Sequence, residues 1–87
     1  MTEPDQATRR RRLLFRATHR GTAENDLMIG GFVRAHLDDL TGPDLDALES
    51  LMDLPDVDLA DWLTGRRAIP AERATPMLLR IRESLTR

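Results

Sequence analysis

The stretch Arg20-Gly21-Thr22-Ala23-Glu24-Asn25-Asp26 decides the fold, because it separates a basic helical segment from a mostly apolar one. Gly21 predicts the end of the first helix, since glycine enters the left-handed conformation without a Cβ penalty. Thr22 predicts the N-cap of the next helix. The helix dipole favours Arg20 in the last turn before the break and Glu24 in the first turn after it. We expect a tight corner that presents a cation, a bare backbone and an anion, although the same residues also serve as simple stop-and-start signals between two helices.

Apolar periodicity and turn signals predict five short helices and no strand. Thr41 with Asp44 reads as a capping box, Thr75-Pro76 reads as a cap and first turn, and Gly65 reads as a helix end. The expected helices cover about residues 7–19, 23–39, 42–53, 57–64 and 76–85. Asp56 reads as the cap of the fourth helix, and Leu78, Ile81 and Leu85 are expected on the buried face of the fifth. The fold class is therefore all-α. Residues 1–87 form a single small compact helical bundle, in which residues 1–6 are expected to be disordered.

The second expected helix carries an apolar stripe and a glycine pair. The stripe follows helical spacing through Ile29, Phe32, Val33, His36 and Leu40. Gly30 and Gly31 each cost about 1 kcal/mol relative to alanine in a helix. We expect another helix backbone to approach closely there. Trp62, the only tryptophan, is expected to anchor the core rather than to contact a partner.

Charge is distributed in three blocks. Residues 1–20 carry +4, residues 21–64 carry −10 and residues 65–87 carry +4, which sum to the net charge of −2. This pattern favours an electrostatically steered protein partner with both signs on its surface. The run Arg9 to Arg12 reads as a solvated helix face or, alternatively, as a contact patch.

The residues needed for catalysis or metal binding are scarce. The chain has no cysteine, His19 has no orienting partner that the sequence identifies, and His36 reads as a hydrogen-bonded residue at the boundary of the apolar stripe rather than a base. The acids Asp53, Asp56, Asp58 and Asp61 lack the calcium-loop spacing, and no glycine-rich nucleotide motif occurs. We expect no enzyme activity, no metal and no bound cofactor. Without an apolar run near the roughly 20 residues of a membrane span or a secretory signal, we expect a cytoplasmic bacterial protein with no transmembrane segment.

Two landmarks resemble a known family. The first is Arg20-Gly21-x-x-Glu24 followed by Asp26-Leu27-Met28-Ile29-Gly30 and Phe32. The second is Pro55-Asp56-Val57-Asp58-Leu59 followed by Trp62-Leu63. Together they resemble the succinate dehydrogenase assembly factor 2 family of bacterial and mitochondrial flavinylation factors. The likeness runs from about Arg11 to Pro70, and it departs from the family pattern at Gly31, Leu48 and Ala60.

The resemblance implies a small helical bundle that binds the flavoprotein subunit of succinate dehydrogenase and promotes covalent attachment of FAD. The FAD and the histidine that receives it would belong to the partner. The fumarate reductase flavoprotein is a second candidate client, and the chain is expected to act as a monomer. The residues assigned to partner binding lie at or near the corner: Arg16, His19, Arg20, Gly21, Glu24 and Asp26.

Two other functions compete with this interpretation. The run Arg9 to Arg12 suggests a small nucleic-acid-binding or antitoxin-like regulator, although the acidic middle and the lack of stacking aromatics oppose it. An amphipathic helix over Ala7 to Ala17 suggests binding at a membrane surface. We favour the assembly factor, and therefore no nucleic-acid partner.

Overall fold

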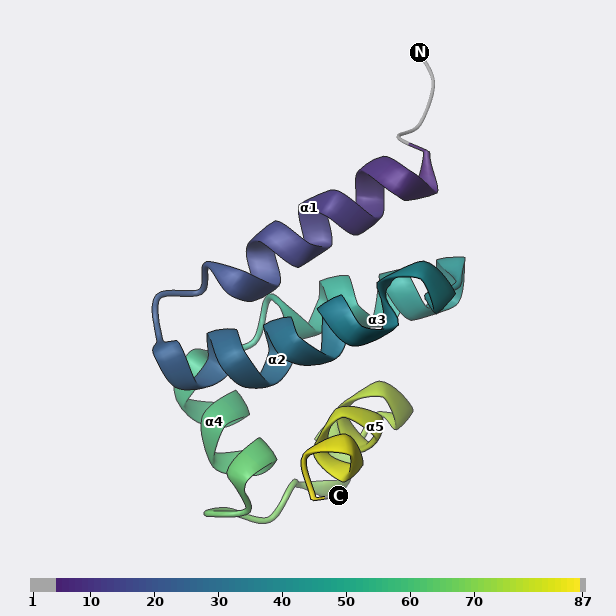
Figure 1. The fold of residues 1–87 in the computed structure, drawn as a ribbon. Coiled ribbons are helices and arrows are strands. Elements are labelled where there is room, and N and C mark those ends of the chain that lie inside the picture. The colour runs from purple at the N-terminus through teal and green to yellow at the C-terminus, as the bar shows by residue number, and fades with distance from the viewer. Residues whose placement is uncertain (1–4, 87) are drawn as a thin grey trace.

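Two helices joined by the corner form one side of the bundle. The computed structural model describes residues 5–86, in which α1 (Gln6–Thr18) and α2 (Ala23–His36) run in roughly opposite directions and pack on each other (Figure 1). The remaining helices are α3 (Gly42–Leu51), α4 (Asp56–Thr64) and α5 (Pro76–Leu85). Helix α3 contacts α1, and α4 contacts α2. Helix α5 contacts α2, α3 and α4. Short 3-10 segments, η1 (Leu37–Asp39) and η2 (Ala71–Arg73), precede α3 and α5. No strand occurs in residues 5–86, so the predicted all-α class is confirmed.

Several helix limits follow the predicted capping signals. The Thr41 hydroxyl accepts from the Asp44 N–H at 3.2 Å, and the Asp44 carboxylate accepts from the Thr41 N–H at 3.1 Å, which completes the capping box. The Thr75 hydroxyl accepts from the N–H of Leu78. Gly65 ends α4 with a φ of +83°, a left-handed conformation that glycine adopts without a Cβ penalty.

Other limits differ from the prediction. Helix α1 begins at Gln6, and the Asp5 carboxylate caps it by accepting from the N–H of Thr8. Asp5 and Gln6 therefore belong to the start of the helix, although the sequence placed them in a disordered stretch. The rest of the stretch expected to be disordered, residues 1–4, lies outside the described residues. Thr22 is the N-cap of α2 by backbone conformation, but its side chain makes no capping hydrogen bond. Pro55, not Asp56, occupies the N-cap of α4, and the Asp56 carboxylate is used elsewhere.

All five helices contribute to one apolar core. Trp62 is buried, as predicted, whereas Leu85 is 39% exposed and was wrongly assigned to the buried face of α5. Leu48, one of the departures from the family pattern, is fully buried, and Ala60 is half-buried. The buried apolar residues are Leu13, Ala17, Ile29, Phe32, Val33, Leu40, Leu45, Leu48, Leu51, Met52, Leu59, Trp62, Leu63, Met77, Leu78 and Ile81.

The glycine pair of α2 has two different environments. A Cβ built on Gly30 would lie 2.7 Å from Cγ2 of Thr18 and 3.2 Å from the carbonyl oxygen of Ala17. Gly30 therefore permits the close approach of α1 that the sequence suggested. A Cβ on Gly31 would meet nothing within 4 Å, so the second glycine is not required for packing.

Alanine substitutions should separate these two roles. We expect Gly31→Ala to raise the free energy of unfolding by about 1 kcal/mol, because alanine is the better helix former and its methyl group points into open space. Gly30→Ala should instead lower it by about 1–3 kcal/mol, because α1 must shift. Chemical denaturation of both variants measures the difference. Equal effects would contradict the close packing at Gly30.

Candidate functional site

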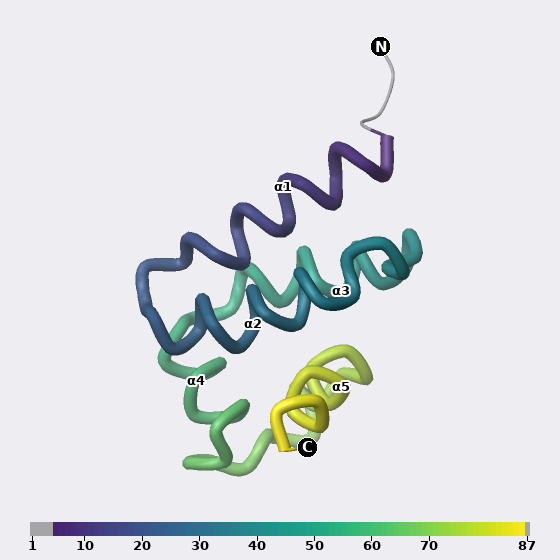
Figure 2. The backbone as a smooth tube through the Cα atoms, in the orientation of Figure 1, coloured from purple at the N-terminus to yellow at the C-terminus, as the bar shows by residue number. Residues whose placement is uncertain are grey.

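The corner turns the chain sharply between α1 and α2 (Figure 2). Helix α1 ends at Thr18, His19 is its C-cap, and α2 starts at Ala23. Gly21 has a φ of +98°, as predicted, a backbone conformation that strains a residue with a Cβ atom. Gly21 is exposed and a Cβ built on it would meet no atom within 4 Å. The space above this glycine is therefore open to another molecule.

The Arg20 side chain points into the domain. It lies beyond the end of α1, not in its last turn, and its side chain is only 9% exposed. Nη1 donates to the carbonyl of Met52 at 2.8 Å and Nη2 to the carbonyl of Leu54 at 2.7 Å. Nε donates to the Asp56 carboxylate at 2.6 Å. Its acceptors therefore lie in the segment between α3 and α4 and at the first residue of α4, whereas the sequence assigned Arg20 to partner binding.

Asp56 and Asn25 complete this internal network. The Asn25 side-chain amide donates to the Asp56 carboxylate at 3.0 Å and to the Asp56 carbonyl at 2.9 Å. Asn25 is fully buried. Burial alone raises the pKa of Asp56, but the hydrogen bonds from Arg20 and Asn25 outweigh it and lower the pKa below its ordinary value. The network ties the corner to the start of α4.

Asp26 also faces its own chain. Its carboxylate accepts from the backbone N–H of Arg20 at 2.8 Å, across the corner. This bond fixes the position of Arg20 relative to the first turns of α2. Arg20 and Asp26 therefore hold the corner in shape.

Glu24 and Gly21 form the outer half of the corner. The Glu24 side chain is 46% exposed, and one carboxylate oxygen accepts from Nη2 of Arg66 at 2.9 Å. Arg66 follows α4 and is 42 residues away in the sequence. Among residues 5–86, no cation other than Arg66 pairs with this carboxylate, and Arg20 does not reach it. The outer surface of the corner therefore includes the Arg66 side chain, which the spacing of residues in the sequence did not predict.

His19 and Arg16 extend the exposed surface along the end of α1. The His19 ring stacks on Phe15 with ring centroids 4.0 Å apart, and its Nδ1 lies 2.8 Å from the Phe15 carbonyl. Phe15 is 63% exposed, which makes it an apolar member of this surface that the sequence argument missed. Arg16 makes an exposed ion pair with Asp53 at 3.2 Å.

The charge blocks pair with each other within the chain. Each of six arginines from residues 1–20 and 65–87 contacts acids from residues 21–64. The predicted need for a partner with both signs is weakened, because much of the complementarity is internal. The pairs are Arg9 with Asp46 and Glu49, Arg16 with Asp53, Arg20 with Asp56, Arg66 with Glu24 and Asp61, Arg67 with Asp58 and Asp61, and Arg80 with Asp44.

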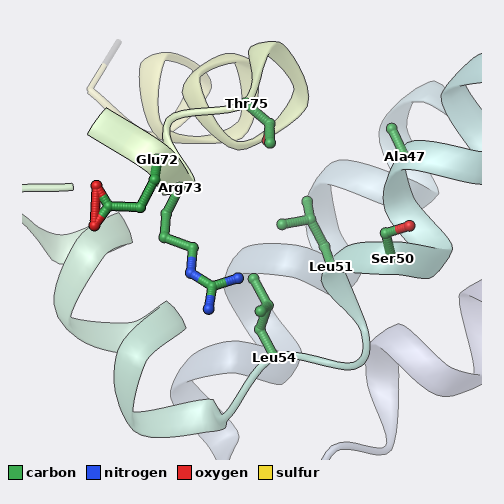
Figure 3. A pocket seen from close by; sticks show the side chains of 7 residues that line it. All are labelled: Ala47, Ser50, Leu51, Leu54, Glu72, Arg73 and Thr75. Atoms are coloured by element: carbon green, nitrogen blue, oxygen red, sulfur yellow. The ribbon is translucent and has the colours of Figure 1, made fainter. Parts of the chain in front are cut away.

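A small pocket lies between the C-terminal part of α3 and the segment that leads into α5 (Figure 3). It has a volume of about 290 Å³ and is lined by Ala47, Ser50, Leu51, Leu54, Glu72, Arg73 and Thr75. This volume is at the lower limit for small-molecule pockets, which is too small for a dinucleotide. None of the six residues assigned to partner binding lines it.

Across residues 5–86, no cluster of His, Asp or Glu side chains is arranged to hold a metal ion. The longest helix there has 14 residues. No helix in this part of the chain has the length and hydrophobicity to cross a bilayer. The outer side of the corner presents an open glycine, a carboxylate with a bound guanidinium, and a stacked ring pair of which Phe15 is 63% exposed.

Comparison with known proteins identifies the family. A family model described as the flavinator of succinate dehydrogenase matches residues 11–85. The chain belongs to this family. The predicted resemblance is thereby confirmed, over a slightly longer stretch than the two landmarks indicated.

Two named relatives of this flavinator family give the likeness in detail. The chain is 52% identical over 83 residues to the FAD assembly factor SdhE of Acetobacter pasteurianus. The matched region covers 95% of this chain and 76% of that protein. It is 32% identical over 83 residues to the mitochondrial succinate dehydrogenase assembly factor 2 of Cryptococcus neoformans, which covers 94% of this chain but only 47% of that protein. No solved structure gives a significant match. The names describe one relative as an FAD assembly factor and the other as an assembly factor of succinate dehydrogenase.

Replacement of Arg20 should test the internal network. We expect Arg20→Met to lower the free energy of unfolding by about 3 kcal/mol, because two carbonyls and the Asp56 carboxylate lose their donor in a largely buried site. Arg16→Met is the matched control, since it removes an exposed pair and should cost less than about 1 kcal/mol. Chemical denaturation measures both. Similar losses in the two variants would contradict a structural role for Arg20.

Asp56 should make stability depend on pH. Its pKa in the folded chain is below the ordinary 3.8, so in acid the unfolded chain binds the proton first. The stabilisation is therefore complete above about pH 5 and is lost as the pH falls through the folded pKa. In urea titrations between pH 6 and 3, Asp56→Asn should flatten this decline relative to the parent chain. An unchanged pH profile in Asp56→Asn would contradict the assignment.

Proposed function

We propose that this chain binds the flavoprotein subunit of succinate dehydrogenase and promotes covalent attachment of FAD to it. Membership of the flavinator family and the names of its relatives support this function. FAD is a cofactor of the partner in this proposal, and the chain itself binds none. The fumarate reductase flavoprotein is the second client to test.

The chain acts by binding, with the redox chemistry left to the flavoprotein. An assembly factor that binds preferentially the conformation in which flavin and acceptor histidine are aligned raises the population of that conformation. Such a role needs a rigid surface of defined shape. It needs no nucleophile or base from the assembly factor.

The observation that carries the proposal is the division of the corner into two halves. Arg20 and Asp26 bond to their own chain and fix the backbone. Gly21 and Glu24 face outward, with open space above the glycine. A bare backbone next to a positioned carboxylate suits close contact with another polypeptide. In this scheme the chain acts as a monomer in the cytoplasm, and Arg16 and His19 lie at the edge of the contact.

A nucleic-acid-binding function has less support. Arg9 is bound to Asp46 and Glu49, and Arg10 donates to the Leu40 carbonyl. Within the basic run, only Arg11 and Arg12 remain exposed. Two cations on one helix turn make a weak footprint for a phosphate backbone.

Substitutions at the outer half should abolish function without unfolding the chain. Gly21→Asn places a side chain in the open space, and asparagine tolerates positive φ better than most residues. We expect at least a tenfold loss of covalently bound flavin on the succinate dehydrogenase flavoprotein, and a similar loss for Glu24→Ala. Fluorescence of the denatured flavoprotein measures the attached flavin.

The control for strain at this corner is Gly65→Asn, since Gly65 also has positive φ and an open Cβ direction. Equal thermal unfolding of the two asparagine variants would show that any loss of flavinylation is not caused by unfolding. Full flavin attachment with a folded Gly21→Asn variant would overturn the proposed site.

A further inference from the structure

The carboxylate of Glu24 is already bound to a cation of the same chain. Arg66 reaches it from the segment after α4, at 2.9 Å between Nη2 and Oε1. The start of α4 lies beside the start of α2 (Figure 1), and their side chains bond there through Asn25 and Asp56. A partner that contacts Glu24 therefore also meets Arg66.

Arg66 is held by two acids at once. Its Nε donates to Asp61 at 3.1 Å while Nη2 donates to Glu24. The hydrogen bond with Glu24, followed by that with Asp61, raises the pKa of Arg66 above its usual value. Two anchoring points restrict this planar group, so less conformational entropy remains to be lost when it binds a further acceptor.

The pair keeps one donor group and one acceptor atom unused. Nη1 of Arg66 and Oε2 of Glu24 have no hydrogen-bond partner among residues 5–86, and the two side chains are 54% and 46% exposed. Side by side, they offer an N–H and a carboxylate oxygen. This combination matches the C=O and N–H of a peptide main chain.

Charge argues against an ionic ligand at this point. Glu24, Arg66 and Asp61 sum to −1, and the neighbouring Arg67 and Asp58 leave that sum unchanged. A carboxylate would approach Arg66 against two acids, and a cation would compete with Arg66 itself. A neutral peptide group meets neither obstacle, and the open glycine three residues before Glu24 leaves room for a main chain.

We propose that Arg66 belongs to the partner-binding surface, where it and Glu24 form a fixed donor–acceptor pair that binds main-chain peptide groups of the flavoprotein. This inference rests on the proposed function. It extends the contact from the corner to the segment that follows α4, and it identifies the partner's contribution as an exposed stretch of main chain.

A double-mutant cycle tests the pair. Binding of the purified flavoprotein subunit is measured by titration calorimetry for Glu24→Ala, Arg66→Ala and the double variant. We expect each single substitution to weaken binding about tenfold or more, and the double variant to be no weaker than either single one, because the two side chains act together. Arg67→Ala is the matched control. Arg67 lies in the same segment, is similarly exposed and bonds to Asp58 and Asp61 but not to Glu24. It should change binding less than twofold.

Two further arms test the chemistry. The exchanged pair Glu24→Arg with Arg66→Glu keeps the ion pair and the net charge but reverses donor and acceptor, so it should bind as poorly as the single variants. The affinity of the parent chain should change less than about threefold between 50 and 300 mM salt, because a neutral peptide group releases few counterions. Recovery of binding by the exchanged pair, or a steep salt dependence, would overturn the main-chain assignment.

The possible failures can be told apart. If Arg66→Ala binds like the parent chain, or if Arg67→Ala loses as much as Arg66→Ala, the inference is wrong. The proposed function would still stand in either case, provided that Gly21→Asn loses binding. If the parent chain does not bind the flavoprotein, the proposed function itself fails.

Discussion

The guanidinium of Arg20 is the interaction on which the arrangement of the site depends. The carbonyl of Met52, the C-cap of α3, lacks an intrahelical partner because it lies at the helix end, and the carbonyl of Leu54 lies between α3 and α4, outside both helices. Arg20 supplies donors to both and also binds Asp56 at the start of α4. One side chain thereby joins the corner after α1 to the end of α3 and the start of α4. Because the group is nearly buried, these bonds are screened little by solvent.

Because Arg20 anchors the corner, neighbouring residues of this short motif have different roles, some structural and some at the surface. Asp26 and Asn25 bond inward, so the first turns of α2 are fixed to Arg20 and to Asp56. Gly21 and Glu24 remain outward, and their positions follow from a backbone that cannot easily shift. A protein that works by selecting one conformation of its partner needs such rigidity, since a surface that adapts to every conformation of the partner selects none.

The sequence predicted what is local. Caps at Thr41 and Thr75 and glycines at 21 and 65 are set by neighbours within four residues, and these predictions are confirmed. The stripe of α2 is buried at Ile29, Phe32 and Val33, whereas His36 is half-buried and Leu40 lies beyond the end of the helix. Long-range pairings were missed. Arg20 finds acceptors 32 to 36 residues downstream, and Arg66 finds Glu24 42 residues upstream. The three charge blocks hinted at such pairs, but a sum of charges cannot say whether opposite signs meet inside the chain or across an interface. Asn25 was visible in principle, since it lies four residues before Ile29 on the buried stripe.

Because the Arg20 side chain points into the domain, substitutions of Arg20 and of its neighbours in the motif must be interpreted differently. An arginine that holds three parts of the backbone affects partner binding through the shape of the corner, so its loss cannot separate contact from folding. Glu24 and Arg66 differ, because an exposed ion pair adds little to stability. Their removal leaves the scaffold intact and reports on the surface alone. The residues most informative about the partner are therefore those that contribute least to the fold, and in this chain Glu24 lies only four residues after Arg20, across the corner between α1 and α2.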